Sequence, residues 1–319
     1  MFLEKITQEK SGIIVYGITP PKAHNSLDKN NEIAAKTVER IKKLNIDGLI
    51  IYDIQDEASR NSDDRPFPFL KTIDPYEYAS EYLKELEVHK IIYRCVGKYE
   101  RRALSTWLNS HDTSKYSSVF VGAPSKHHVS TMKLSEAYDL RNSLSNHGIL
   151  GGVTIFERHF KNENEHLRII EKMQYGCSVF ITQCIFNIGY AKDVLSDLYF
   201  YCLANDLKIP TIIFTLTTCG SLKTLNFMEW LGIHCPKWMK NELKNSHDIL
   251  DSSINLSLAI AEEIAEFCTS KNIPFGINIE SVSLLKDEID ASIELLNKTT
   301  QILKEKVKSK NAATISLNR

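Results

Sequence analysis

Eight short apolar runs, each followed by a segment with helical periodicity, are the feature that most constrains the fold of this chain. The runs are rich in β-branched and aromatic residues, which is typical of strands buried on both faces. In chain order the runs span residues 12–16, 48–52, 90–96, 117–122, 151–156, 179–182, 210–216 and 275–279. The segments with helical periodicity span about 30–44, 74–86, 101–108, 134–144, 163–174, 190–205, 222–231 with 251–269, and 285–307. Strands that alternate with helices predict a parallel α/β sheet, and eight units predict closure into a single (β/α)8 barrel, a TIM barrel.

The predicted barrel accounts for nearly the whole sequence. We expect it to occupy residues 1–310, with residues 311–319 as a polar C-terminal tail. A chain of 319 residues falls within the size that one α/β barrel takes, and no linker-like segment divides it. The sequence therefore predicts one domain.

Charge and apolar patterning limit the classes of partner. The 39 Lys and Arg residues are balanced by 40 Asp and Glu residues, which gives no electrostatic reason to expect a nucleic acid or a membrane as partner. The chain has no secretory signal pattern and no apolar run long enough to cross a bilayer. Seven scattered cysteines without a Cys-x-x-Cys pair are typical of buried structural thiols. We expect a cytoplasmic protein with a small-molecule substrate; a homo-oligomer is possible.

In a barrel of this type the functional residues lie where the strands end, at the carboxyl edge of the sheet. Three carboxylates, Asp53, Glu157 and Glu280, fall at such positions. A carboxyl group whose pKa is raised by burial can act as a general acid near neutral pH. Glu157 and His159 are separated by one residue, so in an extended chain they would point the same way. For Asp53 and Glu280 the alternative is a solvated carboxylate or an ion pair with Arg94 or Lys98. For Glu157 and His159 it is a salt bridge within a loop or a cap at the start of a helix.

Metal and nucleotide sites lack sequence support. His127 and His128, with His111 nearby, do not have the spacing of a metal-ligand set, and no Cys/His set does, so no metal is predicted. The Gly-x-Gly-x-x-Gly, Walker and Gly-x-Ser-x-Gly motifs are all absent. A Rossmann site, a P-loop and a hydrolase nucleophile elbow therefore have no support from motifs.

Three segments carry a resemblance to a known family. Thr19-Pro-Pro-Lys22 follows the first predicted strand, Ile181-Thr-Gln-Cys-Ile-Phe-Asn187 ends the sixth, and Gly232-Ile-His-Cys-Pro-Lys-Trp238 follows the seventh. In order and spacing they resemble the 5,10-methylenetetrahydrofolate reductases. That family is an eight-stranded α/β barrel that binds FAD and reduces a methylene-folate with NAD(P)H. The resemblance implies a flavin-dependent oxidoreductase of one-carbon (folate) metabolism.

The resemblance also implies roles for individual residues. Gln183 matches the glutamine that hydrogen-bonds the pterin ring of the folate, and Thr19 and Asn187 lie in the neighbouring substrate-binding segments. His159 and Lys172 match residues that contact FAD. By this resemblance the cofactors are FAD and an NAD(P)H donor, and the substrate is a tetrahydrofolate derivative.

Two catalytic positions of the family differ here. Gly17 stands where the family has the glutamate that protonates the folate, and Gly122-Ala-Pro124 replaces an Arg-Gly-Asp. A glycine cannot donate a proton, so Glu157, Asp53 or Glu280 is expected to supply the acid. Two alternatives follow from the same differences: a flavin-independent, folate-dependent transferase or hydrolase, and a non-catalytic folate-binding barrel.

Overall fold

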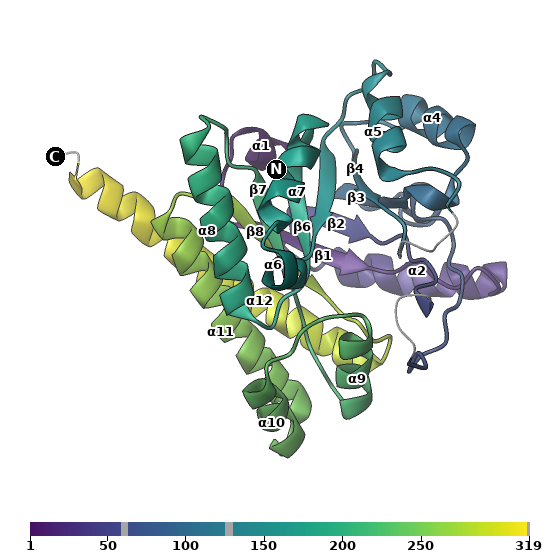
Figure 1. The fold of residues 1–319 in the computed structure, drawn as a ribbon. Helices are drawn as coiled ribbons and strands as arrows, with labels where there is room; N and C mark the ends of the chain where they lie inside the picture. The colour runs from purple at the N-terminus through teal and green to yellow at the C-terminus, as the bar shows by residue number, and fades with distance from the viewer. Residues whose placement is uncertain (59–62, 125–129, 318–319) are drawn as a thin grey trace.

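The computed structural model of the protein describes residues 1–58, 63–124 and 130–317, and it contains a closed barrel of eight parallel strands (Figure 1). Each strand pairs with the next along the chain, and the last strand pairs with the first. The strands are β1 Ile13–Ile18, β2 Gly48–Ile51, β3 His89–Cys95, β4 Tyr116–Val121, β5 Leu150–Thr154, β6 Cys177–Cys184, β7 Thr211–Thr217 and β8 Phe275–Glu280. The predicted (β/α)8 barrel is confirmed.

Helices cover the outside of the barrel, as Figure 1 shows. They are α1 Phe2–Thr7, α2 Leu27–Ile41, α3 Pro75–Glu77, α4 Arg101–Ser110, α5 Leu134–Asn142, α6 Glu157–Asn162, α7 Glu165–Gln174, α8 Ile188–Ala204, α9 Leu222–Trp230, α10 Lys237–Asn245, α11 Ile249–Ser270 and α12 Lys286–Leu317. A central apolar layer packs the helices against the strands, except for α1, whose Phe2 and Ile6 belong to the cluster inside the barrel. Among the described residues, no helix has the length and the apolar character needed to span a membrane.

Several helices differ from the sequence-based expectation. The helix expected over 74–86 is the short α3 followed by a π-helical turn, Tyr78–Tyr82. Helices α1, α6 and α10 were not predicted, because each is short and has too few apolar positions for a periodic signal. Helix α12 runs beyond the predicted end at 307 and into the expected polar tail, where lysine and alanine are good helix formers. The division at residue 310 stays a prediction.

A small apolar cluster fills the barrel and fixes which side chains point inward. It includes Ile13 and Val15 of β1 and Val179 and Ile181 of β6, and α1 closes its base. Because side chains alternate along a strand, the next inward positions toward the carboxyl ends follow directly. They are Gly17 on β1, Tyr52 after β2, Gln183 on β6, and Asn278 and Glu280 on β8. We call the end of the barrel where these residues lie the mouth.

Candidate ligand site at the barrel mouth

Glu280 is the carboxyl group at the centre of the mouth. It ends β8 and pairs in register with Gly17 of β1 and Thr217 of β7. The Cys184 thiol donates a hydrogen bond to its side chain, and Tyr52 and Asn278 lie beside it. Among the described residues no cation forms an ion pair with it. Burial raises the pKa of Glu280, so the group tends to hold its proton and can donate a hydrogen bond or a proton.

Tyr52 occupies the space that a side chain at position 17 would need. A Cβ built on Gly17 would lie 2.8 Å from Cε2 and 2.9 Å from the hydroxyl oxygen of Tyr52. The Tyr52 hydroxyl accepts a hydrogen bond of 2.8 Å from Nδ2 of Asn278, and the ring packs edge-on against Tyr93. The glycine at position 17 therefore lets the Tyr52 ring lie over β1, beside Glu280 of β8.

A bulge in β6 turns a cysteine toward the same carboxyl group. Ile181 pairs with Ile213 and Cys184 pairs with Thr215, so β6 has one more residue than β7 between these pairs. The thiol of Cys184 donates a hydrogen bond of 3.0 Å to Oε1 of Glu280, and burial raises the pKa of the thiol well above its usual value. All seven cysteines are buried with free thiols, as predicted, but strict alternation did not reveal that Cys184 reaches the mouth.

The raised pKa of Glu280 gives a testable pH dependence of stability. The folded protein keeps the Glu280 proton to a higher pH than the unfolded chain does, because a glutamate in an unfolded chain has a pKa of about 4.3. The preference of the folded state for the protonated Glu280 stabilises the protein fully below the pKa of the unfolded chain. That stabilisation is lost as the pH rises through the pKa of Glu280 in the folded state. We expect the melting temperature of Glu280→Gln, minus that of the wild type, to increase between pH 4 and pH 8. Thermal unfolding of both proteins across this range measures it, and a constant difference would contradict it.

Glu157 lies at the first position of α6, on the β5 side of the mouth. Its Oε1 accepts a hydrogen bond of 3.3 Å from the backbone N–H of His234, and burial raises its pKa. Nδ1 of His234 lies 3.4 Å from Nδ2 of Asn187, and Oδ1 of Asn187 caps the start of α8. Glu157 and Glu280 are both close enough to Cys184 to raise the pKa of its thiol. The two candidate acids therefore lie near one thiol, with Asn187 at the edge of this group.

The expectation that Glu157 and His159 point the same way is wrong, because both residues are in α6. Two residues apart in an α-helix, side chains are turned by about 200°. His159 points into the helix layer, where Nε2 lies 3.2 Å from Oδ2 of Asp197 and Nδ1 accepts a hydrogen bond from the backbone N–H of Glu165.

Lys172 also lies away from the mouth. It is in α7, and its ammonium group donates a hydrogen bond to the carbonyl oxygen of Val153 on β5. Its side chain packs beside Gly152, and burial lowers its pKa. The two residues expected to contact FAD, His159 and Lys172, therefore have partners inside the helix layer, and their geometry gives no support to a flavin site.

His159, His166 and Asp197 form a cluster that could in principle hold a metal ion, since one ligand atom from each lies within 4.8 Å of the others. The hydrogen bond that His159 Nδ1 accepts leaves the ring proton on Nε2, where it faces Asp197. The cluster is thus arranged as a histidine–carboxylate pair. His127 and His128, considered above for metal binding, lie outside the described residues.

Asp53 is bonded to three partners, and of the three carboxylates it is the least available for contact with a ligand. Its side chain is fully buried and pairs with the ammonium group of Lys98, one of the pairings considered from the sequence. The backbone N–H of Cys95 donates to Oδ2 at 2.7 Å, and the Tyr99 hydroxyl donates at 2.9 Å. This arrangement ties the end of β2 to the turn after β3. It favours a structural role for Asp53 over proton donation.

The remaining predicted substrate-binding residues lie around the mouth. Gln183 ends the inward row of β6, and its Nε2 donates a hydrogen bond of 3.0 Å to the carbonyl oxygen of Leu231, just after α9. Its side-chain carbonyl oxygen has no hydrogen-bond partner in the described structure. Thr19 follows β1 and is half-buried. The mouth therefore brings together Gln183, Glu157 and Glu280, with Thr19 and Asn187 at its edge.

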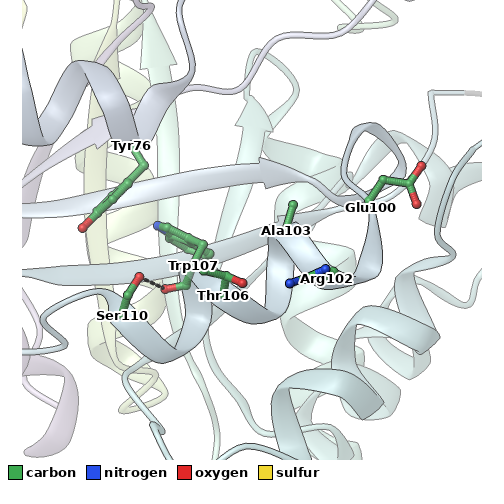
Figure 2. Close-up of a pocket in the computed structure, with 7 residues that line it drawn as sticks. All are labelled: Tyr76, Glu100, Arg102, Ala103, Thr106, Trp107 and Ser110. Atoms are coloured by element: carbon green, nitrogen blue, oxygen red, sulfur yellow. Dashed lines mark hydrogen bonds between the residues drawn. The ribbon is translucent and has the colours of Figure 1, made fainter.

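An open groove of about 670 Å³ lies elsewhere, on the helix layer (Figure 2). Tyr76 and Trp107 pack edge-on within it, and Arg102 and Glu100 line its other end. The Arg94 guanidinium lies 4.2 Å from the centre of the Trp107 ring and pairs with Asp74. The groove is formed by α3 and α4, outside the strand ends where barrels of this type hold their ligands.

One solved structure is closely similar to this chain. An uncharacterized protein from Clostridium thermocellum that binds two copies of 5-methyl-5,6,7,8-tetrahydrofolic acid is 49% identical, with a TM-score of 0.85. The match covers 95% of this chain and 100% of that protein. The chain belongs to the family of this Clostridium thermocellum protein. No family model matches the chain, and no curated protein does.

Two other solved structures match this chain at low sequence identity. A 2,3-dimethylmalate lyase is 12% identical, with a TM-score of 0.43 over 97% of this chain and 96% of its own. A dihydropteroate synthase from Xanthomonas albilineans is 10% identical, with a TM-score of 0.46 over 91% and 92%. Neither bears on function. None of these matches is a methylenetetrahydrofolate reductase, and none supports the binding of FAD or NAD(P)H.

Proposed function

We propose that this protein binds a reduced folate, of the type of 5-methyltetrahydrofolate, at the mouth of its barrel. The observation that carries the proposal is the ligand of the Clostridium thermocellum relative, whose whole length is matched at 49% identity. The chemistry of the mouth supports it. A pterin ring offers adjacent hydrogen-bond donors and acceptors, which suit an amide such as Gln183 and a carboxyl group such as Glu280.

In this proposal the two residues have complementary tasks. Gln183 meets the pterin edge through its unbonded side-chain carbonyl oxygen, while its Nε2 stays fixed on Leu231. Glu280 tends to hold its proton and so donates a hydrogen bond to a ring nitrogen or oxygen. Tyr52 and Tyr93 provide aromatic surface at the inner side of the mouth. The flavin is not part of the proposal, because His159 and Lys172 have their partners in the helix layer.

Titration of the purified protein with 5-methyltetrahydrofolate tests this function. Gln183→Ala removes one hydrogen-bonding group from the site, so we expect affinity to fall by about 10-fold, the equivalent of roughly 1.4 kcal/mol. Asn109→Ala is the matched control, because this exposed amide of α4 bonds only its own helix. Isothermal titration calorimetry gives both affinity and stoichiometry. A wild-type protein that does not bind the folate would overturn the proposal.

A second candidate is a flavin-independent reaction on the bound folate. One observation favours it: Glu157 and Glu280, both with a raised pKa, lie near the same thiol. When a one-carbon group leaves a folate nitrogen for an acceptor, that nitrogen must take up a proton, and a neutral carboxylic acid can supply it. Glu280→Gln separates the two candidates, because it removes the acid while keeping the shape of the side chain.

A further inference from the structure

Arg65 is held in a cage of three aromatic rings, two of which belong to α9. It belongs to the segment 55–73 that leads from β2 to α3. Its guanidinium carbon lies 5.5 Å from the ring centre of Phe69, 5.3 Å from that of Phe227 and 5.4 Å from that of Trp230. These distances are within the range of cation–π attraction. The rings come from two separate parts of the chain, so the cage fixes the guanidinium in place before any ligand arrives.

This guanidinium has no carboxylate partner among the residues that the structure describes. Its Nε and Nη1 are buried without a hydrogen-bond acceptor. Asp56 and Glu57 are the acidic groups that act on it from a distance, while burial lowers its pKa. An arginine remains protonated at neutral pH. A charged group with this many unused donors, held rigidly, is suited to bind an anionic ligand.

A second cation shares the same aromatic cluster. Nζ of Lys223, on α9, lies 4.6 Å from the ring centre of Phe67. The Phe67 ring packs edge-on against Phe227, at 5.1 Å between ring centres. No ion pair of Lys223 with any described residue is present. Two cations therefore lie against one small set of rings, an arrangement that matches a ligand with two negative charges.

The cage is connected to the ligand site through the end of α9. The indole N–H of Trp230 donates to the carbonyl oxygen of Asp63 at 2.8 Å, which fastens the segment after β2 to α9. The next residue, Leu231, accepts the hydrogen bond of Gln183 from β6. Figure 1 shows α9 on the same side of the barrel as the loop that follows β2. Arg65 and Gln183 therefore contact consecutive residues at the end of α9, Trp230 and Leu231.

We propose that Arg65 binds a carboxylate of the glutamate tail of the folate, with Lys223 beside it for the second carboxylate. The inference rests on the proposed function and gives it a direction: the pterin lies toward Glu280 and Gln183, and the glutamate end lies toward α9. Because folates carry their two carboxylates at the end opposite the pterin, the two ends of the site have distinct chemistry. Arg65 then determines specificity for folates over pterins that lack the tail.

Two probes and one variant test the assignment. 5-Methyltetrahydrofolate carries the glutamate, and 6-methyltetrahydropterin lacks it. We expect Arg65→Met to weaken binding of the folate by about 10- to 100-fold, the range of hydrogen bonds to a charged group, and to leave binding of the pterin unchanged. Methionine keeps apolar volume inside the cage. An equal loss for both probes, or a loss for neither, would overturn the role of Arg65.

Controls separate this inference from the function on which it rests. Arg102→Met, in the exposed groove of α4 (Figure 2), removes an arginine away from the mouth and should change neither affinity. Arg65→Lys keeps the charge without the planar fork and should give an intermediate loss for the folate. If the wild type binds neither probe, folate binding itself fails. If the wild type binds both probes equally tightly, only the assignment of Arg65 fails. Circular dichroism melts confirm that each variant is folded.

Discussion

Gly17→Ala should destabilise the protein by about 1–3 kcal/mol, the usual cost of inserting a methyl group into a packed site. The new Cβ would lie 2.8 Å from the Tyr52 ring, which is too close for the ring to stay where it is. Tyr52 would have to give up its hydrogen bond with Asn278 and its place beside Glu280. Denaturant unfolding of variant and wild type measures the loss. Gly122→Ala is the matched control, because its Cβ would meet only Leu134, at 3.7 Å.

A double variant shows whether the Tyr52 ring is the cause. In the Tyr52→Ala background the ring is absent, so adding Gly17→Ala should cost almost nothing, and the coupling energy should equal the single-variant loss of about 1–3 kcal/mol. The same cost in both backgrounds would contradict the explanation. The result also bears on chemistry, because a glutamate at position 17 would meet the same ring. Gly17, Tyr52 and Glu280 therefore form one packed group, in which the carboxyl group on β8 pairs in register with the glycine on β1.

The barrel could be predicted from the sequence because its signal is repeated eight times. Buried parallel strands are nearly continuous apolar runs, and small errors at their ends do not change the count. The alternation of side chains along a strand also predicts which polar residues face the barrel interior. Gln183 lies two residues after the inward Ile181, and Glu280 lies two residues after the inward Asn278. These positions follow from alternation alone.

The chemistry of the candidates could not be predicted in the same way, because it depends on tertiary partners. Asp53 and Glu280 both follow apolar strands, yet one carboxylate has Lys98 beside it and the other has only uncharged partners. The short helix α6 separated Glu157 from His159, and its six residues have no apolar period to reveal it. The β6 bulge brought Cys184 to Glu280 against the alternation. The aromatic cage of Arg65 could not be predicted, because Phe227 and Trp230 lie far from Arg65 in the sequence and only the fold brings the rings together.

Asp53→Ala should lower stability more than any other carboxylate substitution at the mouth, by about 3–5 kcal/mol, the range for removing one partner of a buried ion pair. Lys98 is partly exposed and can turn toward water, which places the expected loss at the lower end of that range. The backbone N–H of Cys95 is buried and cannot turn toward water, so it loses its acceptor. Chemical denaturation measures the change. Asp290→Ala, which breaks an exposed pair with Lys286, should cost no more than about 0.5 kcal/mol.

The same variant decides between the structural and the chemical interpretation of Asp53. Tyr99 bonds both Asp53 and Asp74, and Asp74 caps the start of α3 and pairs with Arg94. The Asp53 pair is therefore one end of a network that anchors the far end of the segment carrying Arg65. If Asp53 is structural, its loss lowers the unfolding free energy, whereas Glu280→Gln leaves that energy nearly unchanged near pH 4. If Asp53→Ala keeps wild-type stability but no longer binds or converts the folate, Asp53 has a chemical role at the mouth and not a structural one.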